Sequence, residues 1–414
     1  MDLSTDLEKR GLIKDKTFDD LSFLDKPQTF YLGIDASSDS LTIGNLAVLV
    51  LARRFIEAGW KGVLLAGGAT SLVGDPGGKE EERQLKSPDE IAVNIKSVKK
   101  QIESSLAGAP HELVNNLDWL GDLKHMDFLR DIGKHYPMTE LMQRDFVTMR
   151  MGKNGTGISY AEFSYSLLQG YDFWWLFKNK GVVLQIGASD QWGNMLSGVP
   201  LIRKKEGQEA HAMCMPLVID KTTGRKFGKS EAGAIWLDPV KTSPTQFYQF
   251  WVNADDGAVG DFLKIYTMLS MEDIAKTMEY HVSSPEERKA QRLLAKEVTE
   301  LVHGKEEAHT AEIVTDVLTG QISIGEVSEG IIEQVRKEIP SEKLRAGTPL
   351  VDALVATGLA ASKSEARRLL SAGAIYINNE GTTVDELKAD DFKNGRLLLR
   401  RGKAFKDSAL VELG

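Results

Sequence analysis

The sequence predicts an α/β protein with a parallel β-sheet covered by helices on both faces, followed by an α-helical domain and a small α+β domain. Four short apolar runs have the length of buried strands: 30–34, 62–66, 182–186 and 213–218. Helical patterns lie between these runs, and such alternation of strand and helix is typical of a parallel sheet. At 414 residues the chain is too long for one compact core, so two or three domains are expected.

The domain boundaries follow from where the periodicity changes. In order, we expect the sheet domain at 1–230 with a connective insertion at about 67–181, an α-helical domain at 231–330, a linker at 331–347 and a last domain at 348–414. The insertion is expected because the gap between the second and third strands is too long for one crossover. The linker is expected because its periodicity is weak. The last domain combines two short helical patterns with a strand at 374–377 and a basic strand at 396–401.

The composition excludes several classes of protein. The net charge of −9 is unfavourable for general nucleic-acid binding, so any RNA contact must use local basic patches. The most apolar run, 46–51, is too short to span a membrane, and the acidic first residues do not resemble a secretion signal. The single cysteine, Cys214, indicates buried packing in a reducing cytoplasm. The seven histidines are scattered, so no protein-bound metal is expected.

Small polar residues connect the first strand to the helix at 45–58. Four hydroxyl side chains lie in this connection: Ser37, Ser38, Ser40 and Thr42. The unpaired N–H groups of a helix N-terminus form a ready phosphate site, and Gly44 leaves room for a base or ribose against the backbone. Taken alone the signal is weak, because most such clusters only cap the helix.

A second motif, Lys-Phe-Gly-Lys-Ser at 226–230, follows a turn-forming stretch at 220–224. Two lysines that flank a glycine on a mobile loop can neutralise charge that develops on a polyphosphate. The alternative is a solvated basic loop, which is the usual role of such a run. The two motifs together are stronger than either one, since they come from opposite halves of one nucleotide fold.

The combination resembles the class I aminoacyl-tRNA synthetases, specifically the bacterial tyrosyl-tRNA synthetases. Thr-Ile-Gly-Asn at 42–45 stands where that family has His-Ile-Gly-His or His-Ile-Gly-Asn, and 226–230 match its Lys-Met-Ser-Lys-Ser signature. Further matches occur in order along the chain at 67–70, 74–76, 163–165, 168–172 and 187–194. The resemblance extends from about residue 7 to the C-terminus. It implies a Rossmann-like catalytic domain, a helical anticodon-binding domain and an S-four-like RNA-binding domain.

The resemblance also implies the reaction. L-tyrosine is activated with ATP, which carries Mg²⁺ with it, to give tyrosyl-adenylate and pyrophosphate. The tyrosyl group is then transferred to the 3′ end of tRNA(Tyr). A tyrosine–tRNA ligase of this kind is expected to be a cytoplasmic homodimer without membrane contact. In-line chemistry of this type needs position and charge rather than a covalent nucleophile.

A tyrosine pocket needs a donor and an acceptor for the phenol hydroxyl. Asp172 lies among aromatic residues, where a carboxylate needs a partner; from the residues alone, pairing with a nearby cation is favoured. The resemblance instead assigns Asp172 and Tyr31 to the substrate hydroxyl. It assigns the substrate amino group to Asp75, Tyr165 and Gln169, and the carboxyl group to Gln191. Tyr165, Gln169 and Asp172 have helical spacing and share one face.

The remaining assignments also follow from the resemblance. ATP binding is assigned to Gly33, Asp35, Ser37, Gly44, Gly187, Asp190, Leu217, Val218 and Lys229. Catalysis is assigned to Thr42, Asn45, Lys79, Arg83, Lys226, Lys229 and Ser230. The tRNA contact is assigned to Lys363, Arg367, Arg368, Arg400 and Arg401. Asn116 and Trp119 match a further family stretch near the pocket but carry little weight.

Thr42 is the main departure from the family. A threonine can donate one hydrogen bond but is shorter than imidazole and is never cationic. Losing one donor to a transition-state oxygen costs about 3 kcal/mol, so Thr42 is expected to weaken catalysis without abolishing it. Three alternatives stay open here: a weakened paralogue that only binds RNA, a tryptophan-specific sister enzyme and a generic nucleotidyltransferase. Tyr31 with Asp172 argues against tryptophan, and the C-terminal module argues against the generic enzyme.

Overall fold

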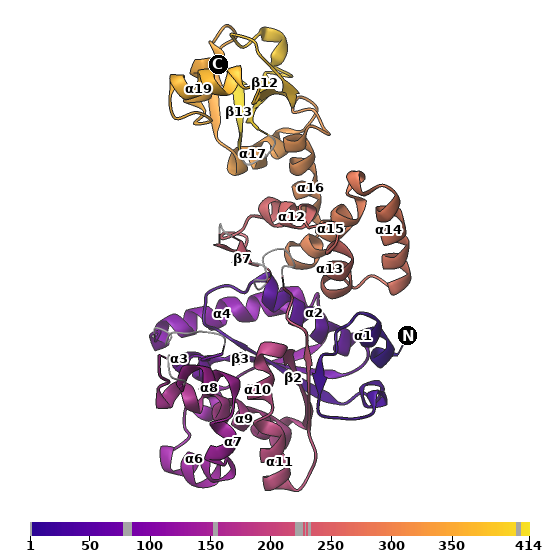
Figure 1. The fold of residues 1–414 in the computed structure, drawn as a ribbon, viewed down its shortest axis with the longest axis vertical. Coiled ribbons are helices and arrows are strands. Elements are labelled where there is room, and N and C mark those ends of the chain that lie inside the picture. The colour runs from indigo at the N-terminus through magenta and orange to yellow at the C-terminus, as the bar shows by residue number, and fades with distance from the viewer. Residues whose placement is uncertain are drawn as a thin grey trace. The chain divides into compact units, whose positions relative to one another are not determined.

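The protein is described here by a computed structural model that covers residues 2–77, 85–151, 156–219, 227, 229–230, 233–402 and 407–414. The chain forms two compact units (Figure 1). The first unit contains Met1–Thr242 and Ala254–Leu294, and the second contains Ser243–Asn253 and Ala295–Gly414. Within the described ranges, no helix has both the length and the apolar character needed to cross a membrane.

The first unit contains a six-stranded sheet with the order β1-β6-β5-β2-β3-β4. The strands are β1 (Asp15–Lys16), β2 (Thr29–Asp35), β3 (Lys61–Gly67), β4 (His111–Asn115), β5 (Val182–Ala188) and β6 (His211–Met215). All neighbours pair in parallel except β1 with β6, so the predicted parallel α/β sheet is confirmed. The sequence missed β1, which has only two residues, and β4, a partly exposed edge strand without a continuous apolar run.

Helices cover both faces of this sheet because successive side chains of each strand point to opposite faces. Phe30 packs on Phe55 of α2 (Ile43–Glu57), whereas Tyr31 packs on Phe173 of α9 (Tyr160–Lys180). In Figure 1, α2 and α4 (Pro88–Ser105) lie on one side of the sheet, with α9 and α11 (Gly198–Glu206) on the other. The insertion contributes α5 (Leu117–Leu120), α6 (His125–Asp131), α7 (Met138–Leu141) and α8 (Asp145–Met151).

The helices expected at 231–330 are divided between the two units. Helices α13 (Val259–Tyr266) and α14 (Met271–Ser283) belong to the first unit, whereas α12 (Pro244–Val252) and α16 (Lys305–Thr319) belong to the second. The boundary falls within α15 (Lys289–His303). The sequence expectation of one separate helical domain therefore differs from the contacts within the structure.

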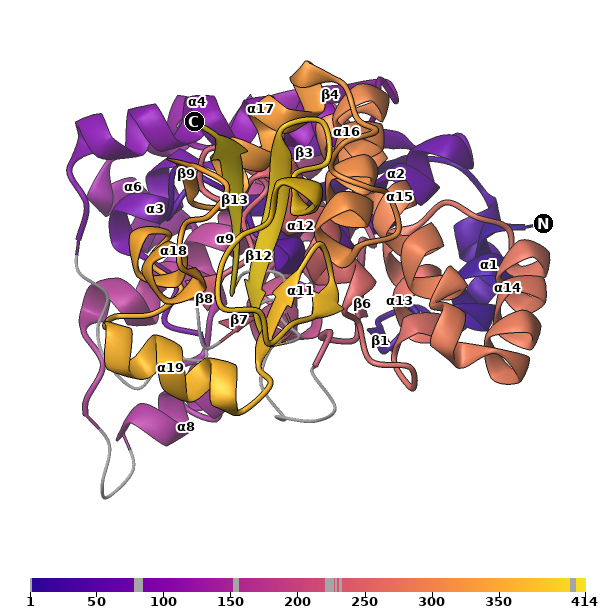
Figure 2. The same ribbon diagram turned by 90° about the horizontal axis from the view of Figure 1, so that it is seen from above.

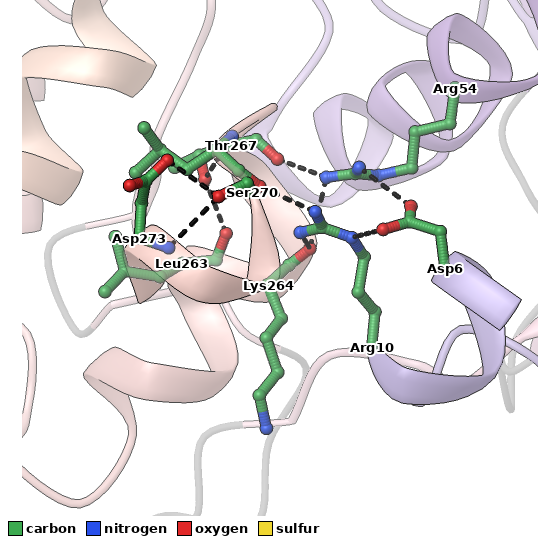
Figure 3. Close-up of polar contacts among 9 residues, drawn as sticks. Asp6, Arg10, Arg54, Leu263, Lys264, Thr267, Ser270 and Asp273 are labelled. Atoms are coloured by element: carbon green, nitrogen blue, oxygen red, sulfur yellow. Dashed lines mark hydrogen bonds and ion pairs between the residues drawn. The ribbon is translucent and has the colours of Figure 1, made fainter. Parts of the chain in front are cut away.

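Two arginines explain why α13 packs with the sheet unit (Figure 3). Arg10 follows α1 (Leu3–Lys9) and donates to the carbonyls of Lys264 and Leu269, at 3.1 and 2.6 Å. Arg54 of α2 donates to the carbonyls of Lys264 and Thr267, and Asp6 accepts from both guanidinium groups. The pKa of Arg54 is lowered to about 10, mainly by burial and then by the nearby charge of Arg10, while Asp6 opposes the shift. These contacts anchor α1 and the C-terminal half of α2 to the end of α13.

The second unit contains a five-stranded sheet with the order β11-β10-β12-β13-β9. Its strands are β9 (Ser341–Leu344), β10 (Ile375–Ile377), β11 (Glu380–Gly381), β12 (Arg396–Arg401) and β13 (Ser408–Leu413). Figure 2 shows α18 (Leu350–Ala356) and α19 (Lys363–Ser371) beside this sheet. The two helices and the two predicted strands of the last domain are therefore present.

The linker expected at 331–347 is instead part of this unit. It holds most of α17 (Glu329–Glu338) and all of β9, which pairs in parallel with β13. The buried stripe of α17, Ile332 and Val335, packs in one cluster with Leu398 and Leu410. The apolar pattern of this helix is short, and its partners Leu398 and Leu410 lie more than sixty residues later in the chain. The local sequence pattern alone therefore did not reveal the packing.

Candidate active site

A cavity of about 740 Å³ opens at the carboxyl ends of the central strands β2 and β5, next to the N-terminus of α2. In an open parallel sheet this is where ligands bind, because loops leave neighbouring strands in opposite directions there. Sixteen residues assigned from the sequence line this cavity: Tyr31, Gly33, Asp35, Ser37, Thr42, Gly44, Asn45, Asp75, Tyr165, Gln169, Asp172, Gly187, Asp190, Gln191, Leu217 and Val218. The fold therefore brings the expected tyrosine and ATP positions, apart from Lys229, to one place.

The expected cationic positions cannot be compared in the same way. Lys79, Arg83 and Lys226 lie outside the described residues. Lys229–Ser230 form the short strand β7, which pairs with β8 (Gly233–Ala234). Phe227 of the same motif lines the cavity, and its ring centroid lies 4.2 Å from that of Phe262 in α13. One residue of the lysine motif is thus fixed beside the cavity.

Tyr31 and Asp172 form the deeply buried end of the cavity, with 1% and 2% of their surfaces exposed. The Asp172 carboxylate accepts hydrogen bonds from Trp119 Nε1 at 2.7 Å and from Asn116 Nδ2 at 3.0 Å. Among the described residues, its hydrogen-bond partners are neutral donors, so the cation pairing favoured from the residues alone is wrong. The Tyr31 hydroxyl is buried and has no hydrogen-bond partner within the described part of the chain.

Burial controls the protonation of both groups. It raises the pKa of Asp172 to about 7, against the two hydrogen bonds that favour the carboxylate. The pKa of Tyr31 is raised well above its usual value by burial and then by the charge of Asp172. This end of the cavity therefore offers a neutral hydroxyl and a carboxyl group that can exchange its proton near neutral pH.

A hydrogen-bond chain connects Asp172 to Asp35 at the end of β2. Asn116 Nδ2 also donates to Thr70 Oγ1 at 3.0 Å, and Thr70 donates to Asp35 at 2.7 Å. The Tyr165 hydroxyl donates to the other Asp35 oxygen, also at 2.7 Å. Thr70 was missed as a site residue, although it lies in the matched stretch 67–70. Asn116 and Trp119 were given too little weight, since each bonds Asp172 directly.

Gly67 leaves room for the hydrogen bond between Thr70 and Asp35. A Cβ atom on Gly67 would lie 2.2 Å from Asp35 Oδ1 and 2.4 Å from Thr70 Oγ1, which is far closer than van der Waals contact. A larger residue would therefore displace Asp35 and Thr70 and break the hydrogen bond between them. The matched glycine at 67 has a packing reason that the sequence alone did not reveal.

The neighbouring wall of the cavity is built around Asp75. Its carboxylate accepts hydrogen bonds from Gln191 Nε2 at 2.6 Å and from the backbone N–H of Gly77 at 2.9 Å. Gln169 of α9 lines the same cavity, as does Gln185 of β5. Gln185 was missed because it lies within an apolar strand, yet its Oε1 is buried without a hydrogen-bond partner among the described residues.

The other end of the cavity lies at the N-terminus of α2 and is more open. Gly44 is exposed, and Thr42 and Asn45 are half-buried. A Cβ atom on Gly44 would meet only Thr42 Oγ1, at an ordinary 3.5 Å, so packing within the protein does not require a glycine. The free space at Gly44 is instead consistent with a ligand against the backbone. In the described ranges, no group of three or more His, Cys, Asp or Glu side chains could hold a metal ion.

Comparison with known proteins agrees with this geometry. The family model for class I tRNA synthetases (W and Y) matches residues 24–318, and that for the tyrosine–tRNA ligase SYY-like C-terminal domain matches 331–406. The tyrosine–tRNA ligase of Roseiflexus castenholzii is 43% identical over 413 residues, covering 96% of each chain. The chain belongs to the tyrosyl-tRNA synthetase family. It is thus a class I aminoacyl-tRNA synthetase, as the resemblance implied.

Two further relatives support the tyrosyl-tRNA synthetase assignment. The tyrosine–tRNA ligase of Geobacillus kaustophilus is 43% identical over 415 residues, covering 97% of this chain and 98% of its own. A solved structure of the C-terminally truncated mitochondrial tyrosyl-tRNA synthetase of Aspergillus nidulans has a TM-score of 0.67 at 33% identity. It covers 75% of this chain and 92% of its own. These relatives do not favour the alternative of a weakened paralogue that only binds RNA.

Proposed function

We propose that this synthetase is a tyrosine–tRNA ligase whose cavity activates L-tyrosine with Mg·ATP and then charges tRNA(Tyr). The observation that carries the proposal is the unpaired, buried Tyr31 hydroxyl beside the Asp172 carboxyl group. A phenol hydroxyl both donates and accepts a hydrogen bond, and this pair supplies the complementary groups. The tyrosyl-tRNA synthetases are themselves the established example of such selection, in which phenylalanine leaves the buried polar groups unpaired.

The wall around Asp75 is proposed to hold the amino-acid end of the substrate. Asp75, Tyr165 and Gln169 would bind the ammonium group, and Gln191 would orient the carboxylate. Asp75 is suited to this role because its carboxylate is buried, already aligned by Gln191 and the Gly77 N–H, and opposite in charge to the ammonium. Asp35 is proposed for the adenylate side and Asp190 for the ribose hydroxyls.

The nucleotide is proposed to lie along the backbone at the open end. Gly33, Ser37, Gly44, Gly187, Leu217 and Val218 would contact ATP there, since all of them line the cavity. Lys79, Arg83, Lys226, Lys229 and Ser230 remain proposed phosphate ligands by resemblance to the family. Mg²⁺ is proposed to enter as part of the ATP substrate.

In the first step a carboxylate oxygen of tyrosine attacks the α-phosphorus of ATP. The bond to the oxygen that bridges the α- and β-phosphates breaks, and pyrophosphate leaves with that oxygen. In the second step a terminal ribose hydroxyl of the tRNA attacks the tyrosyl carbonyl carbon, and AMP leaves. The protein contributes alignment and charge, so no side-chain nucleophile is needed.

The tRNA contact is proposed for the basic face of α19 and the strand β12. Arg367 and Arg368 are exposed and form no ion pair with a described residue. Lys363 pairs with Asp352, and Arg401 pairs with Asp407, so their charges are partly neutralised. Arg400 lies over the Tyr376 ring, 5.0 Å from its centroid. Arg367 and Arg368 are therefore proposed as the main phosphate contacts.

A homodimer is proposed through the connective insertion. Seven exposed large apolar side chains lie on its helices or beside them: Leu117, Met126, Leu129, Met138, Met142, Met149 and Met151. A monomer rarely exposes so many apolar side chains in one segment, and a second copy would cover them. Sedimentation of the whole protein tests this proposal, and the change Met126→Glu should shift the equilibrium toward monomer.

The cytoplasm is the proposed compartment, because the only cysteine, Cys214, is a buried free thiol.

Amino-acid-dependent exchange of pyrophosphate with ATP tests the proposed activity. We expect exchange with tyrosine and at most traces with phenylalanine or tryptophan. Absence of exchange with all three would remove the enzyme function and favour the RNA-binding alternative. Exchange that is fastest with tryptophan would reject the role proposed for Tyr31 and Asp172. Charging of tRNA, followed with and without the changes Arg367→Ala and Arg368→Ala, separates tRNA binding from activation.

A further inference from the structure

The side chains of Thr42 and Asn45 at the start of α2 are bonded to each other. Thr42 Oγ1 donates to Asn45 Oδ1 at 3.1 Å, and the backbone N–H of Thr42 donates to the same oxygen at 3.0 Å. A hydroxyl has one hydrogen, so the Thr42 hydroxyl cannot donate to Asn45 and to a phosphate oxygen at the same time. The arrangement therefore does not favour direct donation from Thr42 to the reacting phosphate.

The two bonds fix the orientation of the Asn45 amide. The backbone N–H of Thr42 can only donate, so a flipped amide would place an N–H group against it; the Thr42 hydroxyl adds a second bond to the same oxygen. The amide is planar, so fixing Oδ1 also fixes the direction of Nδ2. This nitrogen has no hydrogen-bond partner among the described residues, and Asn45 lines the ATP end of the cavity together with Thr42.

We propose that Thr42 is a positioning residue that acts through Asn45, and that Asn45 Nδ2 is the group that donates to the phosphate oxygens of ATP. The proposal rests on the proposed function, because it requires ATP to bind at this end of the cavity. Thr42 holds the amide so that its two N–H groups meet the phosphate without reorientation during the reaction. A preorganised donor of this kind is worth more than one that must first rotate into place.

The proposal differs from direct donation by Thr42 in a way that a double-mutant cycle can measure. If Thr42 acts only through Asn45, its hydroxyl is useless once the amide is removed. If Thr42 contacts the phosphate itself, its loss lowers the rate whether or not Asn45 is present. The two cases predict different rates for the double variant, since residues that act as one unit are not additive.

The experiment uses the full-length enzyme and four variants: Thr42→Val, Thr42→Ser, Asn45→Ala and the double variant Thr42→Val with Asn45→Ala. The rate of tyrosyl-adenylate formation is measured in single turnovers at saturating tyrosine and ATP, with KM for ATP measured separately. Thr42→Val keeps the shape of threonine without the hydroxyl. It should lower the rate about tenfold, since the bond from the backbone N–H to Asn45 remains.

Thr42→Ser restores the hydroxyl and should stay within about twofold of the native rate. Asn45→Ala should lower the rate about a hundredfold, as expected for a lost donor to a transition-state oxygen. The double variant should be no slower than Asn45→Ala alone. The effects should fall on the rate at saturation more than on KM for ATP.

Additive losses in the double variant would overturn the proposal, and so would a Thr42→Ser rate as low as that of Thr42→Val. Tyrosine binding, measured by equilibrium dialysis, controls for folding, since Tyr31 and Asp172 lie at the other end of the cavity. A native enzyme without tyrosine-dependent exchange would reject the proposed function instead. Failure of the function is thereby distinguished from failure of the Thr42 proposal.

Discussion

The two ends of the cavity are built in opposite ways. At the tyrosine end, Tyr31 and Asp172 are almost completely buried, and Asn116 and Trp119 hold the carboxyl group in place. At the ATP end, Gly44 is exposed and the side chains of Thr42 and Asn45 are only half-buried. Selection between similar amino acids needs buried groups that become costly when they are left unpaired. A polyphosphate is recognised by its negative charge, and open loops and backbone N–H groups can bind it.

The largest effect expected from this contrast is the pH dependence of stability that Asp172 causes. The pKa of this group is raised from 3.8 to about 7 in the folded protein. Between these pH values the folded state keeps a proton that the unfolded state has lost, so stability falls as the pH rises from about 4 to about 7. The difference corresponds to about 4 kcal/mol. The change Asp172→Asn should remove this contribution. The free energy of unfolding of the variant minus that of the native protein should therefore be larger at pH 8 than at pH 5.

Urea denaturation of both proteins between pH 5 and pH 8 measures this effect. The exposed Asp118 provides a matched control, since Asp118→Asn should leave the pH dependence unchanged. Parallel pH profiles for the native protein and the Asp172→Asn variant would show that the carboxyl group is not buried in the way described here.

The next largest effect is on selectivity. Asp172→Asn keeps the size of the side chain but replaces one carboxyl oxygen by an NH₂ group, which cannot accept a hydrogen bond. We expect kcat/KM for tyrosine to fall about a hundredfold, because a buried bond to a charged group is lost and a polar group is mismatched. Discrimination against phenylalanine should fall with it. Exchange assays with both amino acids check the result, and unchanged selectivity would contradict the role of Asp172.

A smaller effect is expected from Trp119, which donates a hydrogen bond to Asp172. Trp119→Phe removes the donor to Asp172, so the pKa of the carboxyl group should rise further and kcat/KM for tyrosine should fall about tenfold. Trp175 gives a matched control, because its ring stacks on Trp119 with centroids 4.2 Å apart. Trp175→Phe should change both quantities much less. Equal effects of the two variants would indicate that packing, rather than the indole N–H, is responsible.

The smallest effect is expected at the ATP end. Gly44→Ala meets no close atom within the protein, so stability should be preserved. The added methyl group should occupy space that the nucleotide needs, raising KM for ATP about fivefold while tyrosine affinity stays constant. Gly193→Ala is the control, because a Cβ atom there has no neighbour within 4 Å and Gly193 does not line the cavity. Unchanged KM for ATP in Gly44→Ala would argue against nucleotide contact at Gly44.

Much of the fold could be predicted, because strongly apolar strands carry a local signal. The four predicted strands correspond to β2, β3, β5 and β6. Strand β9 and helix α17 could not be found in the same way. Strand β9 is mostly exposed and is defined by its pairing with β13, and the buried residues of α17 pack on Leu398 and Leu410, far along the chain. Within the site, the resemblance to the family assigned residues such as Asp172 to the substrate, whereas the apolar neighbours of Asp172 alone favoured an ion pair with a nearby cation.

The sequence by itself determined the α/β class, the family and the set of residues that gather in the cavity, because motifs and hydrophobic periodicity are local properties of the chain. Only the tertiary structure decided how those residues pair. It gave Asp172 neutral partners and linked Asp35 to Tyr165. It also committed the Thr42 hydroxyl to Asn45. Hydrogen-bond partners and burial depend on the distances between segments that the fold brings together, and spacing along the chain does not contain those distances.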